Sequence, residues 1–336
     1  MAVRISFILP CYNVEKYVQH CIDSILAVQL SEEDYEMLCF DDGSRDDTPR
    51  ILDCYAELHK NVHVFHSSQN VGLSKGRNNL INKAEGEYVW FVDSDDSVCS
   101  QSVQTLLNIA EKKDLEILAF NYRDLNEDGS VIKNSTFFKD TETTNGVEFI
   151  KNVFGTYLVD HIGYVWRFIY KREYLLKHQM YFPEGYWEDT IYMPKAIILA
   201  SKVQSTTICG YEYWHHQTSI CRTMERRYPG KMLYEFSFVA GVDLYKLGTE
   251  VEDKWLKEQL QEISIRKYFN FFPPYLCRAG RKERKIFYSL VRTNRDRIRF
   301  AQSYMRTLPK LLVTPVLGPI IAEVAYVVYK IKHMNQ

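Results

Sequence analysis

The sequence lacks the cysteine patterns of a disulfide framework or of a zinc site. It has eight cysteines in 336 residues, with no CxxC pair and no Cys/His cluster of zinc-finger spacing. Several of them lie inside apolar runs, where a free cysteine behaves as a small buried hydrophobic residue. We therefore expect a protein of a reducing compartment, the cytoplasm.

Long hydrophobic runs are also scarce. The apolar run in the opening "MAVRISFILPCYN" is too short for a signal peptide. Residues 311–329 contain a single charge, Glu323, but Pro315, Gly318 and Pro319 interrupt them. A membrane-spanning helix needs about 20 uninterrupted apolar residues, so we favour peripheral contact with a membrane surface over a span. Ordinary packing of this stretch on the protein stays open.

The chain has no large excess of either charge, since its formal net charge is −1. The charge is unevenly distributed, however. Residues 278–336 contain 13 Lys and Arg against 3 Asp and Glu (net +10), and the remainder contains 29 against 40 (net −11). A basic C-terminal region on an acidic body indicates contact with an anionic surface. No motif indicates a nucleic-acid partner, and no repeat or low-complexity segment is present.

What the sequence does contain is an alternation of strand-like and helix-like segments. Short β-branched or apolar runs predict buried strands, and apolar residues at helical spacing separate them. The predicted strands are 3–9, 35–40, 62–65, 88–92 and 115–120, and the predicted helices are 14–28, 47–58, 73–84 and 102–112. This order predicts an α/β fold with a mostly parallel sheet. Residues 121–137 read as a surface hairpin around Asp128-Gly129.

The pattern changes along the second half of the chain. It is mixed from 145 to 220 and mostly helical after 228. We therefore predict a catalytic domain over residues 1–222 and a helical C-terminal region over 223–336, which is basic and apolar.

Polar loops follow each of the first four predicted strands, at residues 10–13, 41–48, 68–79 and 93–96. The carboxyl ends of parallel strands share one edge of a sheet, so these loops should converge there. The fourth loop follows "VWFV" and reads "DSDD", with three carboxylates in four positions. Like charges this close repel each other unless a cation lies between them. We predict that Asp93 and Asp95 bind Mg²⁺ or Mn²⁺, which in turn binds a diphosphate.

Four segments in this order resemble family 2 glycosyltransferases of the GT-A fold. They are "ISFILPCYNVEKYVQHCIDSIL", "CFDDGSRDDT", "NVGLSKGRNNLINKAEGEYVWFVDSDD" and "WEDT". The resemblance is dense over residues 3–98, resumes near 160–220 and does not extend beyond about 225. It implies a GT-A fold and a nucleotide-sugar donor, most simply a UDP-sugar. It also implies an acceptor that is a saccharide or a lipid-linked saccharide, in bacterial polysaccharide synthesis.

The resemblance also implies roles for individual residues. Asp42 would accept a hydrogen bond from the uracil imide, with Asp41 less certain beside it. Asp95 would be the direct metal ligand, and Asp93 would contact ribose or metal. The other implied nucleotide contacts are Pro10, Tyr12, Lys75 and Arg77.

In "WEDT", Asp189 matches the catalytic base of inverting members, and Glu188 stands beside it. Asp189 would take a proton from the acceptor hydroxyl, which attacks the anomeric carbon from the face opposite the nucleotide. A single base without a carboxylate nucleophile fits inversion. His215 or His216, at the end of the segment that resembles the family's tyrosine-rich strand, would contact the donor phosphate. The alternative is a partly exposed histidine pair without this role.

Structural explanations stand beside several of these assignments. Asp46, Asp47, Thr48 and Asp96 are better explained as residues at helix starts than as ligands. The aromatic residues Tyr164, Trp166, Tyr186 and Trp187 could stack on an acceptor sugar or pack in the core. Two other functions remain as alternatives: a catalytically silent sugar- or lipid-binding scaffold, and a nucleotidyltransferase. The latter would be expected to have a glycine-rich basic signature where this chain has "PCYNVEKY".

Overall fold

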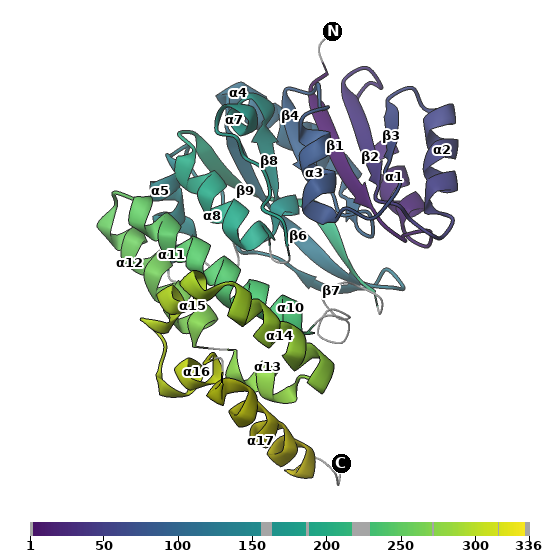
Figure 1. Ribbon diagram of the computed structural model, residues 1–336. Coiled ribbons are helices and arrows are strands. Elements are labelled where there is room, and N and C mark those ends of the chain that lie inside the picture. The colour runs from purple at the N-terminus through teal and green to yellow at the C-terminus, as the bar shows by residue number, and fades with distance from the viewer. Residues whose placement is uncertain are drawn as a thin grey trace. The chain divides into compact units, whose positions relative to one another are not determined.

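A computed structural model describes residues 3–155, 163–185, 188–216, 229–270, 272–314 and 316–332 (Figure 1). The chain forms two compact units. The first comprises residues 1–184 and 188–216, and the second comprises residues 185–187 and 217–336. We call them the catalytic unit and the C-terminal unit. The domain boundary predicted at residue 222 lies outside the described residues.

The catalytic unit is built on one mixed sheet with the strand order β3-β2-β1-β4-β8-β6-β9-β5, and β7 pairs with β6. The first four strands in this order are mutually parallel, as the alternating pattern predicted. The strands are β1 (Ile5–Cys11), β2 (Tyr35–Asp41), β3 (Val62–His66), β4 (Tyr88–Phe91), β5 (Ser97–Val98), β6 (Ile117–Asn126), β7 (Val131–Asn134), β8 (Phe168–Lys171) and β9 (Val203–His215).

Beyond β4 the sheet departs from a simple parallel order. β8, from a distant part of the chain, lies between β4 and β6 and is antiparallel to both. Alternation along the sequence therefore located the strand at 115–120 but not its neighbour, because pairing with β8 depends on contacts some 50 residues away. The hairpin predicted at 121–137 is present, since β6 and β7 pair antiparallel and the amide of Asn126 bonds to the carbonyl of Ser130.

Helices cover the sheet, and each turns an apolar side to it. In α1, for example, Val18, Cys21, Ile22 and Ile25 are fully buried in the main core cluster. Burial of such a side chain is worth roughly 1.5–3 kcal/mol, so the amphipathic spacing itself holds these helices on the sheet. The helices of this unit are α1 (Val18–Leu26), α2 (Thr48–Leu58), α3 (Leu73–Ile81), α4 (Ser100–Lys113), α5 (Gly146–Phe149), α7 (Arg172–Lys177) and α8 (Glu188–Leu199).

The C-terminal unit is helical over its described residues, as predicted. Its core includes a cluster of Phe238, Phe272 and Phe287, with ring centroids 5.4–6.0 Å apart. No helix among the described residues is both long and apolar enough to cross a membrane. The α-helices are α10 (Pro229–Tyr234), α11 (Gly241–Glu250), α12 (Lys254–Ile263), α13 (Pro273–Arg278), α14 (Arg281–Thr293), α15 (Arg295–Gln302), α16 (Thr307–Leu312) and α17 (Leu317–Lys332).

The free thiols include Cys11, Cys21, Cys39, Cys54, Cys99 and Cys209. Cys11, Cys21 and Cys39 are buried in the sheet core, as the apolar runs around them predicted.

Candidate active site

The carboxyl ends of the parallel strands meet at one edge of the sheet. The strand register aligns Cys11 with Asp41 and Asp41 with His66. It also aligns Ile8 with Phe91, so the loop that begins at Asp93 lies beside the end of β1. The convergence of polar loops expected from the sequence is therefore present in the catalytic unit.

The first loop supports the fourth. Pro10 is buried at the end of β1, and its carbonyl accepts a hydrogen bond of 2.8 Å from the hydroxyl of Ser94. Tyr12 follows with 43% of its surface exposed. Pro10 thus fixes the "DSDD" loop, while the ring of Tyr12 is available to a ligand such as a nucleotide base.

Asp42 is occupied by the backbone of another loop. One carboxylate oxygen accepts a hydrogen bond from the amide of Val71 (2.6 Å), and the other accepts one from the amide of Gly72 (2.8 Å). Gly72 has φ +96°, a conformation that favours glycine, and it stands directly before α3. Asp42 therefore positions the start of α3. Recognition of a base by its remaining lone pairs stays a prediction.

Asp41 has its own partners. Its carboxylate accepts from the amide of Ser44 at 3.0 Å and lies 3.0 Å from Nδ1 of His66. Asp46 accepts from the amide of Thr48, the first residue of α2, so its predicted place at the helix start is confirmed.

Arg77 joins three of the segments singled out in the sequence. It lies on α3 with 3% of its side chain exposed, and it donates to Asp93 at 2.7 Å and to Glu188 at 2.6 Å. Burial alone would lower the pKa of the guanidinium, but the charges of Asp93 and Glu188 outweigh burial and raise the pKa. Lys75, two residues earlier, is half exposed and pairs with Glu184 at 3.1 Å.

Gly76 allows α3 to approach the sheet. A Cβ atom at this position would lie 3.0 Å from the ring of Phe40 and 3.7 Å from Cβ of Pro10. The neighbouring Arg77 is thereby held close to the strand ends.

The "DSDD" loop concentrates negative charge. Burial, and secondarily the charge of Asp93, raises the pKa of Asp95 to about 6, while His216 opposes the shift. No lysine or arginine is among the groups that act most strongly on Asp95 in the described chain. A cation bound beside Asp95 would favour the ionised form of this carboxyl group and offset the cost of its burial.

Asp93 and Asp95 therefore fit a divalent metal. The described residues contain no cluster of three or more His, Cys, Asp or Glu side chains that could hold an ion by themselves. Mg²⁺ commonly binds through one or two carboxylates and completes its shell with phosphate oxygens and water. Two carboxylates would fit this pattern of coordination, because they would leave most positions around the ion to other ligands.

Asp96 is not a helix cap, contrary to the prediction. Cys99 occupies the position before α4, and Asp96 is buried, accepting from the hydroxyl of Tyr211 (2.9 Å) and the amide of Trp214 (2.8 Å). The hydroxyl of Tyr211 in turn accepts from the amide of Asp93 at 3.1 Å. Sequence spacing gave no signal for these bonds, because they join segments 115 to 118 residues apart.

Glu188 and Asp189 form the first turn of α8, where negative charge is favourable. Glu188 is held by Arg77. Burial and the neighbouring Glu188 raise the pKa of Asp189 well above its usual value, while Arg77 opposes the shift. One buried arginine thus joins Asp93 of the "DSDD" loop to Glu188, the neighbour of the predicted base in the chain.

The two histidines differ in their surroundings. Nε2 of His215 lies 2.9 Å from Asp124 of β6, so this ring is used within the sheet. His216 is 5% exposed and packs against Tyr17 with ring centroids 3.9 Å apart and the rings tilted by 32°. Its Nε2 bonds to the carbonyl of Asp95 at 2.8 Å. His216 is therefore the one positioned beside the candidate metal ligands.

Trp166 packs in the core. It is 4% exposed and stacks on Tyr211 at a centroid distance of 4.4 Å. Tyr164 is 38% exposed at the edge of the same aromatic cluster. Tyr186 and Trp187 lie outside the described residues.

A family model described as glycosyl transferase family 2 matches residues 6–178. The chain belongs to glycosyltransferase family 2. It is 32% identical over 226 residues to the uncharacterized glycosyltransferase EpsJ of Bacillus subtilis, a match that covers 66% of this chain and 63% of EpsJ. It is 26% identical over 278 residues to the poly(ribitol-phosphate) beta-glucosyltransferase of Bacillus spizizenii, covering 80% of this chain and 40% of that protein. The chain thus spans less than two thirds of the length of these two relatives.

Solved structures give the fold. The S. aureus TarS fragment 1–349 in complex with UDP-GlcNAc matches with a TM-score of 0.70 at 20% identity, over 98% of this chain and 92% of that chain. The mannosyltransferase PcManGT of Pyrobaculum calidifontis, in complex with GDP-Man and Mn²⁺, matches with a TM-score of 0.53 at 14% identity, over 98% of this chain and 88% of that chain. The predicted GT-A fold with a helical C-terminal extension is confirmed.

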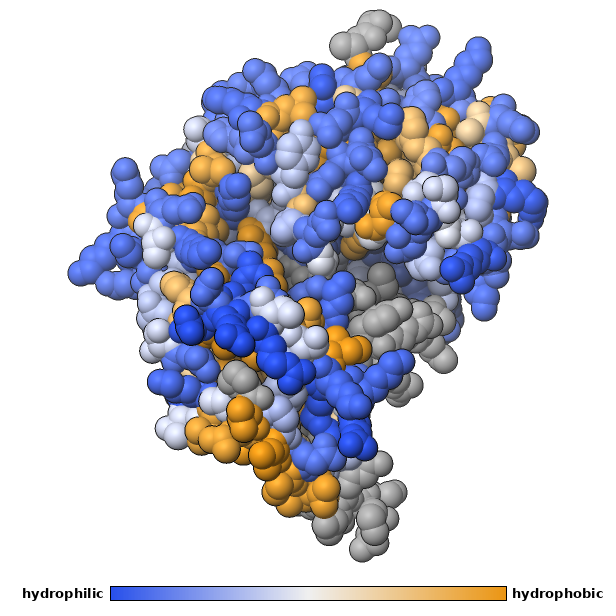
Figure 2. Space-filling model, viewed as in Figure 1, coloured by the Kyte–Doolittle hydropathy of each residue, from blue (hydrophilic) through white to orange (hydrophobic). Residues whose placement is uncertain are grey.

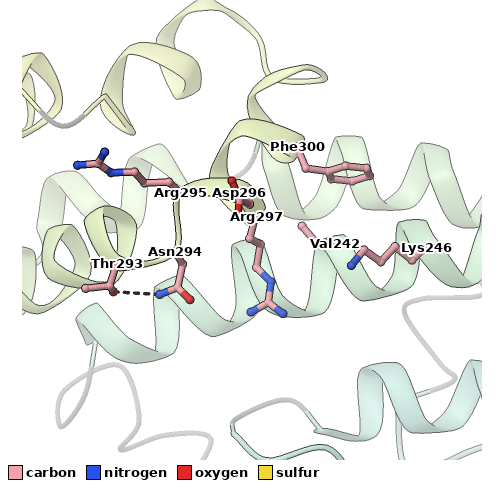
Figure 3. Close-up of a pocket in the computed structure, with 8 residues that line it drawn as sticks. All are labelled: Val242, Lys246, Thr293, Asn294, Arg295, Asp296, Arg297 and Phe300. Carbon is pink, nitrogen blue, oxygen red and sulfur yellow. Dashed lines mark hydrogen bonds between the residues drawn. The ribbon is translucent and has the colours of Figure 1, made fainter.

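A cavity is also present away from the candidate site residues. It belongs to the C-terminal unit and has a volume of about 480 Å³ (Figure 3). It contains none of the predicted site residues, and Arg295 extends away from the other side chains drawn there. Its lining residues are Val242, Lys246, Thr293, Asn294, Arg295, Asp296, Arg297 and Phe300.

Proposed function

We propose that the protein is an inverting, metal-dependent glycosyltransferase that moves a sugar from a UDP-sugar to a hydroxyl of a saccharide or lipid-linked saccharide. The observation that carries this proposal is the pair of ion pairs made by Arg77. They connect the "DSDD" loop, which would bind the donor diphosphate, to the start of α8, which would supply the base. The UDP-GlcNAc complex of TarS supports the choice of UDP.

Asp189 is the proposed general base. Because Arg77 already engages Glu188, Asp189 is the carboxylate of the pair left to accept a proton from the acceptor hydroxyl. Burial raises the pKa of Asp189, which makes its carboxylate a stronger base. Glu188 acts as a positioning residue that, together with Arg77, fixes the start of α8.

Asp95 and Asp93 would hold the metal, Mn²⁺ or Mg²⁺. When bound, such an ion stabilises the negative charge that grows on the departing diphosphate. Pro10 and Ser94 hold the loop that carries these carboxylates, and Tyr211 and Asp96 fix it to β9. Tyr12, Asp42 and Lys75 would contact the nucleotide, and His216 would contact the donor phosphate.

We further infer that the acceptor belongs to a bacterial surface polymer and that transfer takes place at the cytoplasmic face of the membrane. Similarity to the poly(ribitol-phosphate) beta-glucosyltransferase and to the minor teichoic acid biosynthesis protein GgaA of Bacillus subtilis supports a surface glycopolymer.

UDP release from a panel of UDP-sugars with Mn²⁺ or Mg²⁺ tests the reaction, because the correct donor should be hydrolysed slowly even without the acceptor. We expect Asp95→Ala and Asp189→Asn each to lower the rate at least about 100-fold. Asp189→Asn should still bind UDP, whereas Asp95→Ala should not bind it through a metal. Asp128→Asn, in the exposed hairpin turn, is the matched control and should keep the wild-type rate.

Binding of UDP without turnover of any donor, in a broad screen of acceptors, would instead indicate a silent scaffold. Release of diphosphate from a nucleoside triphosphate and a sugar phosphate would indicate a nucleotidyltransferase. Absence of metal-dependent UDP binding by the wild type would contradict the assignment of Asp93 and Asp95.

A further inference from the structure

The last two helices of the C-terminal unit expose an unusual amount of apolar surface. Helix α17 turns aliphatic side chains outward along one side. Two leucines of α16 and Val316, directly before α17, add to this surface. Orange atoms gather over α17 at the lower end of Figure 2. We call this surface the apolar face, and its members, each 38–73% exposed, are Leu308, Leu311, Val316, Leu317, Ile320, Val324, Val327 and Val328.

The orientation of α17 is fixed by its opposite side. Ala322 is fully buried, and a Cβ atom on Gly318 would lie 2.1 Å from the carbonyl oxygen of Leu312, so α17 packs closely on α16. The hydroxyl of Tyr288 also bonds to that carbonyl, at 2.9 Å. The helix is therefore not free to rotate its aliphatic side chains inward without losing these contacts.

The single acidic residue of α17 does not disturb the apolar face. Glu323 pairs with Arg284 at 2.5 Å, and Arg284 is itself 4% exposed. The guanidinium of Arg284 lies 4.3 Å from the ring centroid of Tyr326. The negative charge of Glu323 is thus neutralised within the unit, at the border of the aliphatic stripe.

Positive charge adjoins the apolar face. The exposed side chains of Arg306, directly before α16, and of Lys310, on α16, lie close in sequence to those of Leu308 and Leu311. Residues 278–336 as a whole have a net charge of +10. A second copy of the chain would bring the same positive charge against this surface, which disfavours pairing of like faces. Aliphatic side chains bordered by cations instead complement anionic lipid.

We propose that the apolar face docks on an anionic phospholipid bilayer, with α17 lying in the interface and Arg306 and Lys310 at the level of the headgroups. Penetration to the acyl boundary suits a helix that is too short to span, and electrostatic attraction adds to burial of the aliphatic side chains. The inference deepens the proposed function by naming the surface that meets the membrane, but docking itself depends only on the C-terminal unit.

Cosedimentation of the full chain with vesicles tests this proposal. We expect strong binding to phosphatidylcholine vesicles that contain phosphatidylglycerol and weaker binding to phosphatidylcholine alone. Val324→Asp and Ile320→Asp should each weaken binding roughly tenfold or more, because each puts a charge where an aliphatic side chain was to be buried. Lys310→Glu should weaken binding to the anionic vesicles at least about fivefold and leave binding to phosphatidylcholine nearly unchanged.

Two matched controls come from exposed positions of the catalytic unit. Leu58→Asp, at a leucine that is 77% exposed, and Lys60→Glu should both bind vesicles as the wild type does. Circular dichroism should show the same helix content in all variants, since the substituted side chains are exposed.

Several results would overturn the proposal. They are absence of wild-type binding to either vesicle, equal binding by Val324→Asp and the wild type, and a concentration-dependent dimer that Val324→Asp abolishes without any vesicle binding. UDP release from a soluble donor should be unchanged in Val324→Asp. A failure of docking can thus be told apart from a failure of the proposed reaction.

Discussion

Arg77 is the residue on which the candidate site depends most. Its guanidinium is buried and satisfies two carboxylates from segments that are distant in sequence, Asp93 and Glu188. Removal of one partner of a buried ion pair strongly lowers the stability of the fold, because the remaining charge has no partner and is still shielded from water.

We therefore expect Arg77→Ala to lower the free energy of unfolding by about 3–5 kcal/mol, measured by urea denaturation at neutral pH. Arg77→Lys should recover only part of the loss, since an ammonium cannot reach two carboxylates as a guanidinium fork does. Lys75→Ala, on the same helix but at an exposed pair, should cost less than about 1 kcal/mol. Equal losses at the two positions would contradict the central role of Arg77.

His66, at the same edge of the sheet, contributes to the stability of the fold in a way that depends on pH. Its Nδ1 lies 3.0 Å from Asp41, and its Nε2 lies 2.9 Å from Asp53. Both nitrogens can donate only in the imidazolium form, and the hydrogen bond to Asp41 is the main cause that raises the pKa of His66. A raised histidine pKa stabilises the fold below the unfolded value of about 6.5, and this stabilisation is lost as the pH rises through the folded value.

His66→Gln should accordingly destabilise the protein more at pH 5.5 than at pH 8.5. Because His66 is partly exposed, the difference should be only about 0.5 kcal/mol. Denaturant unfolding at both pH values measures it. A larger loss at pH 8.5 would reverse the sign and contradict the assignment.

At the scale of elements, β9 connects the core to the "DSDD" loop. The hydroxyl of Tyr211 is fully buried, where it donates to Asp96 and accepts from the amide of Asp93. Its ring meanwhile stacks on Trp166. The position of the candidate metal ligands therefore depends on β9. This strand is the last but one in the sheet, whereas β3 and β2 lie at the opposite edge.

Tyr211→Phe keeps the ring and removes these hydrogen bonds. We expect a loss of about 1–3 kcal/mol in stability, because a partly buried amide and a buried carboxylate lose a partner. Mn²⁺-dependent UDP binding, measured by calorimetry, should weaken as well. Tyr181→Phe, whose hydroxyl donates to Asn82 on an exposed surface, should change neither quantity appreciably. Unaltered metal-dependent binding in Tyr211→Phe would show that β9 does not position the loop.

At the scale of the whole molecule, the two units have separate tasks in our proposals. The donor would bind within the catalytic unit, and the bilayer would contact the C-terminal unit. A ligand slows local opening where it binds, so the two tasks can be separated by hydrogen exchange.

We expect UDP with Mn²⁺ to slow amide exchange in residues 41–48, 68–77 and 93–98, and to leave α13, α14 and α15 unchanged. Anionic vesicles should produce the converse pattern, with protection in α16 and α17. Hydrogen-exchange mass spectrometry of the full chain measures both. Protection of α17 by UDP alone would contradict this division.

Local sequence patterns predicted most elements of the catalytic unit and a candidate set of site residues. Apolar periodicity located the strands and helices of the first 120 residues, since burial of one side is a local property that spacing records. The carboxylates after the fourth strand indicated a cation because they are neighbours in the sequence. Their mutual repulsion can therefore be inferred without the fold.

Which distant side chains meet became clear from the folded chain alone. The insertion of β8 beside β4, the bonds of Asp96 to β9 and the use of Asp42 to hold α3 all join residues that are far apart in the chain. The pairing of Arg77 with Glu188 across 111 positions is of the same kind. Such contacts depend on strand order and register, which no local pattern encodes. For the same reason, the outward direction of the aliphatic side chains of α17 followed from its packing on α16 and not from their spacing.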